Sequence, residues 1–229
     1  MCKIRILEVS FDTHLQPYQL PQLRGAIISK VGFEYDLFHN HNKETNNFYN
    51  RYPLIQYKID THKGQMRPMI LCIENAIEEA FHFFSKSDLT VNIKGKQYDL
   101  KIAQLKINTY MVNKEQIINS YRLHKWQALN PEAYKKYNQI DSFSSKLMFL
   151  EKRLQTHISS FASGVGCRFA SSISIEITNL LKTEWINFKN IKTLAFTIDF
   201  KTNISLPDFI GLGKGSALGY GVTRIQKVI

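Results

Sequence analysis

Two histidines, His39 and His41, stand one residue apart in the polar segment Phe38-His39-Asn40-His41-Asn42-Lys43. Histidine is the one side chain that can both take and give a proton near pH 7 without a shifted pKa. RNA is cut when its own 2′-hydroxyl attacks the adjacent phosphate, which requires a base, an acid and a positive charge. Two histidines with a nearby lysine or arginine can supply all three without a metal.

Two other interpretations of the histidine pair stay open. Two solvent-exposed loop histidines would give the same pattern. A metal pair would need a third and a fourth ligand, and the sequence offers no matching cluster of His, Cys, Asp or Glu. We therefore predict no metal site and no cofactor.

A second feature with chemical potential is the glycine-rich stretch 211–221, in which five glycines surround Lys214. Glycine allows positive φ and lets backbone N–H groups approach a ligand, so this loop could form an anion-binding concavity. A short strand follows it rather than a helix, and the P-loop spacing is absent, which excludes both common nucleotide motifs. A flexible hairpin connection is the alternative.

The bulk composition indicates a polyanionic partner. Among 229 residues, 30 Lys and Arg outnumber 19 Asp and Glu, for a net charge of +11. This excess favours nucleic acid first and an anionic membrane surface second. Because no apolar run approaches about 18 residues, we expect no membrane span.

The three cysteines, Cys2, Cys72 and Cys167, are odd in number and far apart. They predict neither a disulfide framework nor a zinc ligand set. A reducing, cytoplasmic compartment fits this pattern best.

Hydrophobic periodicity in the first half predicts strand, helix, strand, strand, helix, strand. The predicted strands are 3–11, 51–59 and 66–72, followed by a hairpin over 89–102. The helices begin at Pro21 and at Ile73, each with apolar residues at helical spacing. This βαββαβ order is typical of the ferredoxin-like fold.

The second half repeats that order less completely. Strands are predicted at 105–111, 173–177, 194–200 and 220–225, with a long helix over 143–161 and weak periodicity over 113–140. No second helix is evident. We therefore predict an α+β protein of two tandem ferredoxin-like (RRM-like) domains, 1–104 and 105–229, the second degenerate.

Basic residues occur in two further regions. Arg51 and Lys58 follow the histidine pair, where they could neutralise phosphates or form a solvated strand edge. In residues 121–137, cations alternate with aromatic rings, as suits single-stranded RNA; a surface helix with aromatic packing is the alternative. This second set consists of Arg122, Lys125, Lys135 and Lys136 with Tyr121, Trp126, Tyr134 and Tyr137.

These residues resemble a known family, the CRISPR repeat-processing endoribonucleases of the RAMP superfamily. The segment Gly211-Leu-Gly213, five residues and Gly219-Tyr-Gly221 is similar to the family's C-terminal pattern just before a final strand. The N-terminal strand, the helix leading into His39 and His41, and Tyr52-Pro-Leu-Ile-Gln-Tyr-Lys58 also resemble it. The similarity covers nearly the whole chain and is weakest over 113–140.

The resemblance implies metal-independent cleavage of precursor RNA within each repeat, leaving a 5′-hydroxyl and a 2′,3′-cyclic phosphate. It assigns His39 and His41 as catalytic, with Lys58 as the transition-state cation. Repeat RNA is the expected partner, with CRISPR effector-complex subunits as further candidates, for a monomer or homodimer. The expected RNA contacts are Gly213, Lys214, Gly215, Ser216, Arg224, Arg51, Arg122 and Lys125. A non-catalytic RNA-binding module and a metal-dependent hydrolase are the alternatives.

Overall fold

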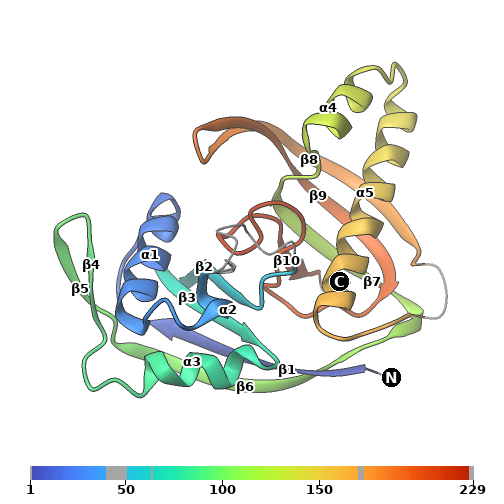
Figure 1. Ribbon diagram of the computed structural model, residues 1–229. Helices are drawn as coiled ribbons and strands as arrows, with labels where there is room; N and C mark the ends of the chain where they lie inside the picture. Colours follow the sequence, from blue (N-terminus) through green and yellow to red (C-terminus); the bar gives the residue numbers. More distant parts are fainter. Residues whose placement is uncertain (1, 40–50, 63, 170–172, 227–229) are drawn as a thin grey trace. The chain divides into compact units, whose positions relative to one another are not determined.

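The computed structural model describes residues 2–39, 51–62, 64–169 and 173–226 (Figure 1). The chain forms two compact units. The N-terminal unit contains Lys3–Tyr110 together with Ala217–Gly219, and the C-terminal unit contains Cys2, residues 111–216 and residues from 220 onward. The three residues 217–219 of the glycine-rich stretch thus belong to the N-terminal unit, while the residues on both sides of them belong to the other.

The N-terminal unit contains a four-stranded sheet in the order β2-β3-β1-β6, which is the ferredoxin-like order. Strand β3 pairs antiparallel with both β1 and β2, in registers that include Leu7 opposite Cys72 and Lys58 opposite Met69. The strands of this sheet are β1 (Cys2–Phe11), β2 (Ile55–His62), β3 (Gln65–Ile73) and β6 (Ile102–Val112).

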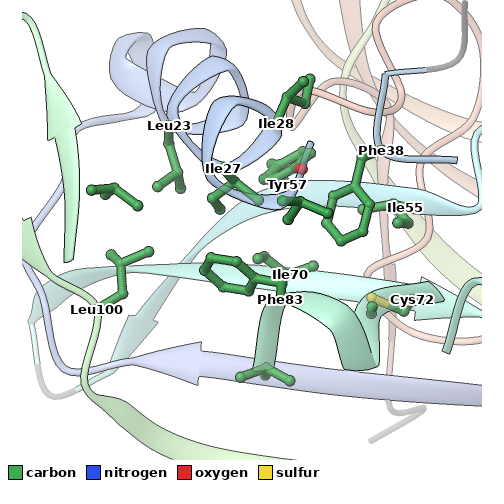
Figure 2. Packing of buried hydrophobic residues seen from close by; sticks show 14 of the residues in the cluster. Leu23, Ile27, Ile28, Phe38, Ile55, Tyr57, Ile70, Cys72, Phe83 and Leu100 are labelled. Carbon is green, nitrogen blue, oxygen red and sulfur yellow. The ribbon is translucent and has the colours of Figure 1, made fainter. Parts of the chain in front are cut away.

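Helices α1 (Leu20–Val31) and α3 (Ala76–Phe84) contact each other and pack against β2 and β3. Their apolar residues recur at helical spacing, so each helix presents one continuous apolar face to the sheet. Figure 2 shows Leu23 and Ile27 of α1 in the same buried cluster as Phe83 of α3. A 3₁₀ turn, η1 (Pro17–Gln19), precedes α1, and the short helix α2 (Asp36–His39) follows it.

The predicted fourth strand of this unit was assigned wrongly. The hairpin at 89–102 forms a separate two-stranded sheet, β4 (Thr90–Ile93) and β5 (Lys96–Asp99). The strand that completes the four-stranded sheet is β6, which the sequence pattern had placed in the second domain. Alternation shows that a segment is a strand but not which sheet it joins, because pairing is decided by distant residues. Residue 104, the expected domain boundary, lies inside β6.

The C-terminal unit repeats the strand order as β10-β7-β9-β8. The corresponding strands are β7 (Lys114–Trp126), β8 (Ile175–Phe188), β9 (Ile191–Ile204) and β10 (Val222–Ile225). Helix α5 (Phe143–Gly164) packs against β8 and buries Leu150, Leu154, Ile158 and Phe161, as the periodicity predicted. No helix is described between β9 and β10, where the glycine-rich loop lies, so the degenerate second ferredoxin-like domain is confirmed.

Two parts of the C-terminal unit contain regular structure that the sequence pattern did not predict. The weakly periodic stretch 113–140 contains β7 and a short helix α4 (Pro131–Asn138), whose first turn is capped by Asn130 Oδ1 accepting from Ala133 N at 2.8 Å. Strands β8 and β9 form a long hairpin through Lys189 and Asn190, at φ 51° and 63°. Such a two-residue turn at positive φ favours a twisted hairpin. The part of this hairpin next to the turn was not predicted, because its residues are mostly exposed and the turn contains no glycine.

The prediction that the cysteines form no disulfide was wrong. Cys2 and Cys167, both in the C-terminal unit, are disulfide-bonded with their Cα atoms 5.6 Å apart, and Cys72 is free and buried. Their separation of 165 residues gave no local spacing signal. The argument for a reducing compartment rested on three free cysteines, and the disulfide removes that support. No helix in the described part of the chain is long and apolar enough to cross a membrane.

Candidate RNA-processing site

His39 ends α2 and is buried, with 7% of its surface exposed. Its Nε2 lies 2.9 Å from the carbonyl oxygen of Phe33 and 3.6 Å from Asp36 Oδ1. Because a carbonyl oxygen only accepts, Nε2 carries the proton in the neutral ring. The side chain is therefore fixed in one tautomer rather than mobile in a solvated loop.

Arg24 on α1 holds the backbone at this histidine. Its guanidinium donates from Nε to the carbonyl of Phe38 at 3.2 Å and from one terminal nitrogen to the carbonyl of His39 at 2.7 Å. These are C-terminal carbonyls of a short helix, which have no partner within it. Burial lowers the pKa of Arg24. The sequence contained a signal for this role, since Arg24 shares a helix face with the apolar Ile27 and Ile28.

Lys58 lies in the middle of β2 and is 1% exposed. Strand alternation places it with Gln56 on the face opposite Tyr57, whose ring belongs to the core of the N-terminal unit. Burial lowers the pKa of Lys58 to about 7. The alternative of a solvated strand edge is thus excluded for Lys58. Its side chain can change its charge near neutral pH.

The remaining predicted residues of the first half are placed only in part. His41 lies outside the described residues. Arg51 is exposed, and its guanidinium donates to the carbonyl of Asp36 at 3.4 Å, at the start of the helix that ends in His39. Arg24 and Arg51 thereby both contact the α2 segment.

The glycine-rich loop is closely packed rather than slack. Gly213 and Gly221 have φ of 81° and 59°. A Cβ at Gly221 would lie 1.9 Å from the carbonyl oxygen of Leu212, and one at Gly213 would lie 2.9 Å from Nε1 of Trp126. Glycine is required at both positions because the conformation and the space exclude a side chain. The hypothesis of a flexible hairpin connection is therefore wrong.

Part of the loop's hydrogen-bonding capacity is used inside the protein. Leu212 N donates to Gly221 O at 2.8 Å, Gly221 N to Lys125 O at 3.2 Å, and Lys214 N to Gln127 O at 3.4 Å. Those three N–H groups therefore do not contribute to an anion-binding concavity. What the loop does present is the side chain of Lys214, which is exposed, with Nζ 5.6 Å from the centroid of the Phe188 ring. Ser216 is buried, at 5% exposure.

Of the other predicted RNA contacts, Lys125 is exposed, whereas two arginines are engaged with carboxylates. Arg122 pairs with Asp199 through two hydrogen bonds of 2.7 and 2.9 Å, and this pairing raises the pKa of Arg122. Arg224 lies 3.4 Å from Asp208 and stacks on the ring of Phe209.

The prediction that Tyr121 and Trp126 present stacking surfaces was wrong, because both are buried in the C-terminal core. Alternation in β7 turns Tyr121 and Leu123 inward, and the irregularity between Leu123 and Trp126, with Lys125 at φ 47°, brings Trp126 to the same buried face. Trp126 Nε1 donates to Nδ1 of His157 at 3.0 Å, and burial lowers the pKa of His157 to about 4. His157 is thus half-buried with its Nδ1 engaged by a core residue, which indicates a structural role.

The described residues contain no group of three or more His, Cys, Asp or Glu side chains placed to hold a metal ion. The features that the structure does show are two sheets of ferredoxin-like order, a fixed histidine after the first helix, and a packed glycine-rich loop before the last strand. Together they define the class of tandem ferredoxin-like proteins to which solved Cas6 structures belong.

Comparison with protein-family models supports this class and specifies the family. The Cas6b N-terminal domain matches residues 2–111 and the Cas6b C-terminal domain matches residues 112–226. The chain belongs to the Cas6b family. The family resemblance drawn from the sequence motifs is thereby confirmed.

Known proteins show the same likeness. A crystal structure of Cas6b has a TM-score of 0.87 at 23% identity, covering 98% of this chain and 100% of that one. A CRISPR RNA processing endoribonuclease Cas6b has a TM-score of 0.71 at 21% identity, with the same coverage. An uncharacterized protein of Methanocaldococcus jannaschii is 27% identical over 142 residues, covering 60% of this chain and 93% of that protein.

Proposed function

We propose that this chain is an endoribonuclease that cleaves CRISPR precursor RNA within its repeats without a metal. The observation that carries the proposal is the match of both Cas6b domain models over residues 2–226. Similarity to a protein described as a CRISPR RNA processing endoribonuclease and the net charge of +11 support it. Repeat RNA is the proposed substrate, with effector-complex subunits as further partners of a cytoplasmic monomer or homodimer.

The proposed reaction is an internal transfer at phosphorus. One histidine of the pair His39 and His41 takes the proton from the 2′-hydroxyl, whose oxygen attacks the adjacent phosphorus. The bond from phosphorus to the 5′-oxygen breaks, and the other histidine gives that oxygen a proton. The products are a 2′,3′-cyclic phosphate and a 5′-hydroxyl, and no water is consumed. The contact between Nε2 of His39 and Phe33 O holds the imidazole in one orientation, as a positioned acid or base requires.

Lys58 is the proposed cation for the phosphate in the transition state. Its pKa of about 7 means that it is charged below neutral pH and loses its charge above. An approaching phosphate would favour the charged form. We infer that the RNA backbone also contacts the exposed cations Arg51, Lys125 and Lys214, and the remaining predicted positions Gly213, Gly215, Ser216, Arg122 and Arg224 stay part of this proposal.

The test is incubation of the CRISPR repeat RNA of the same genome with pure protein, with and without EDTA. We expect cutting in both, and no cutting when the nucleotide before the scissile phosphate carries a 2′-deoxy substitution, although that RNA still binds. His39→Ala and His41→Ala should each lower the single-turnover rate by about 10²–10⁴-fold with affinity little changed. His82→Ala, at an exposed histidine on α3, is the matched control.

A second candidate is a non-catalytic RNA-binding module, which the burial of His39 and its bond to Phe33 O favour, because both also suit a structural histidine. It predicts that wild-type protein binds repeat RNA tightly and leaves it uncut after long incubation. Equal losses of affinity and rate in His39→Ala would count against the catalytic assignment. Activity that EDTA abolishes would instead indicate a metal-dependent hydrolase.

A further inference from the structure

A pocket in the C-terminal unit lies largely outside the predicted site residues. Its volume is about 260 Å³, just below the roughly 300–1,000 Å³ of pockets for drug-sized ligands, which suits one nucleotide. Of the residues predicted to bind RNA, Lys214 and Tyr134 line it. The other polar or aromatic lining residues are Asn130, Trp185, Lys192 and Thr193.

An exposed tryptophan forms the aromatic surface of this pocket. Trp185 on β8 keeps 50% of its surface exposed, which is unusual for so large an apolar ring. The ring of Tyr134 from α4 meets it at 68°, with centroids 5.8 Å apart. This edge contact holds the indole in place, so a flat ligand meets an ordered surface.

Two lysines place positive charge beside the indole. Nζ of Lys192, on the neighbouring strand β9, lies 5.4 Å from the centroid of the Trp185 ring. Lys214 comes from the glycine-rich loop. Its backbone pairs with that of Gln127 in an isolated antiparallel β-bridge, and it is flanked by glycines at positive φ. Among the described residues that line the pocket none is acidic, so no negatively charged side chain repels an anionic ligand there.

Polar groups for a base edge are also present. The side-chain amide of Asn130 uses its oxygen for the α4 cap, which leaves its NH₂ group as the donor end. Thr193 also lines the pocket, and its hydroxyl donates to Ile191 O at 3.4 Å, so toward another group it can act as an acceptor. An aromatic face with ammonium groups and a few polar edges is the pattern that binds unstacked bases of single-stranded RNA together with their phosphates.

We propose that this pocket binds one unpaired nucleotide of the RNA substrate, its base stacked on Trp185 and its phosphates near Lys192 and Lys214. This inference rests on the proposed function, since it assigns to the pocket part of the same RNA. A base within a duplex cannot stack on a side chain, so the nucleotide must lie in a single-stranded part of the repeat or be flipped out.

The experiment uses full-length protein and repeat RNA with the 2′-deoxy substitution that prevents cleavage. Trp126 is fully buried and Trp185 is half exposed, so a change in tryptophan fluorescence on binding reports Trp185. We expect that RNA quenches this emission, and that Trp185→Ala binds about 5- to 150-fold more weakly, as for loss of one stacked base. Trp185→Phe, which keeps a ring, should restore most of the affinity.

The matched control is Phe143→Ala, which removes another exposed ring (63% exposed) of the same unit outside the pocket. If Trp185→Ala and Phe143→Ala bind the RNA with equal affinity, the inference is wrong and the pocket does not bind a nucleotide of this RNA. A parallel cleavage assay with unmodified RNA separates the two proposals. If RNA binds the wild-type protein and quenches its Trp185 emission but is never cut, the endoribonuclease proposal is refuted and the pocket assignment stands.

Discussion

The two units have the same strand order but connect the third and last strands of their sheets in different ways. In the N-terminal unit, helix α3 and a hairpin lie between β3 and β6. In the C-terminal unit, the glycine-rich loop takes that place between β9 and β10. A helix supplies its own backbone hydrogen bonds, whereas this loop obtains several from β7 and from itself. The missing helix is thus replaced by a loop whose backbone, at Gly213 and Gly221, is packed too closely for a side chain.

The two units also handle charge differently. The N-terminal unit buries His39 and Lys58, and burial lowers the pKa of Lys58 into the neutral range. The C-terminal unit keeps Lys125, Lys192 and Lys214 exposed, the last two over aromatic rings. Buried groups that change protonation suit proton transfer, and exposed permanent charges suit binding of an RNA backbone.

The largest predicted effect tests the packing of the loop. Gly221→Ala should lower the free energy of unfolding by about 2–4 kcal/mol, because the new Cβ meets the Leu212 carbonyl and φ is positive. Gly25→Ala is the control, since nothing lies within 4 Å of that Cβ and α1 gains helix propensity, stabilising by about 0.5–1 kcal/mol. Urea unfolding measures both, and equal effects would remove the contrast between loop and helix.

The next effect concerns Lys58. Its pKa is about 7 folded and 10.5 in its ordinary state, so between these values the unfolded chain binds more protons. The free energy of unfolding should therefore rise with pH above about 7, by about 1.4 kcal/mol per pH unit at most. Lys58→Met should abolish this rise and remove the destabilisation present below pH 7. Unfolding measured between about pH 7 and 8.5 checks it, and an unchanged slope in Lys58→Met would contradict it.

A smaller pH effect is expected in the C-terminal unit. The pKa of His157 falls from 6.5 to about 4 on folding, so the unfolded chain binds more protons in that window. Stability should fall by up to about 1.4 kcal/mol per pH unit as the pH drops below 6.5. His157→Gln, which keeps an acceptor for Trp126, should flatten that dependence. Acid unfolding followed by tryptophan fluorescence measures it; a slope retained in the variant would rule out His157 as its source.

The smallest effect compares two cations of the same unit. Lys214→Gln should reduce the salt dependence of RNA binding by about 0.7 in the log–log slope, as for one phosphate contact on a single strand. Arg122→Gln should reduce it less, because Arg122 is already paired with Asp199. Filter binding of uncut repeat RNA at several salt concentrations provides both slopes. A larger change in Arg122→Gln would show that the Asp199 pair opens on binding.

Sequence periodicity was sufficient to predict elements whose buried face is set by residue spacing within the element itself. The stripe Leu150, Leu154 and Ile158 could be predicted, because residue spacing determines it. The positive φ at Gly213 and Gly221 was one of two interpretations that the glycine-rich stretch allowed. The membership of β6 in the first sheet could not, since alternation does not specify a partner strand. Burial of Lys58 and the pocket at Trp185 also escaped prediction, because tertiary packing decides which polar side chains are covered and which rings stay exposed.

The disulfide between Cys2 and Cys167 has a practical consequence for mapping the protein with proteases. A single cut at any peptide bond between these two cysteines leaves both fragments covalently joined. Such nicked protein would migrate as one species in a non-reducing gel and separate into two only after a thiol is added. Digestion patterns taken without reductant would therefore hide every such cleavage, including those next to His39, Lys58 or Lys125.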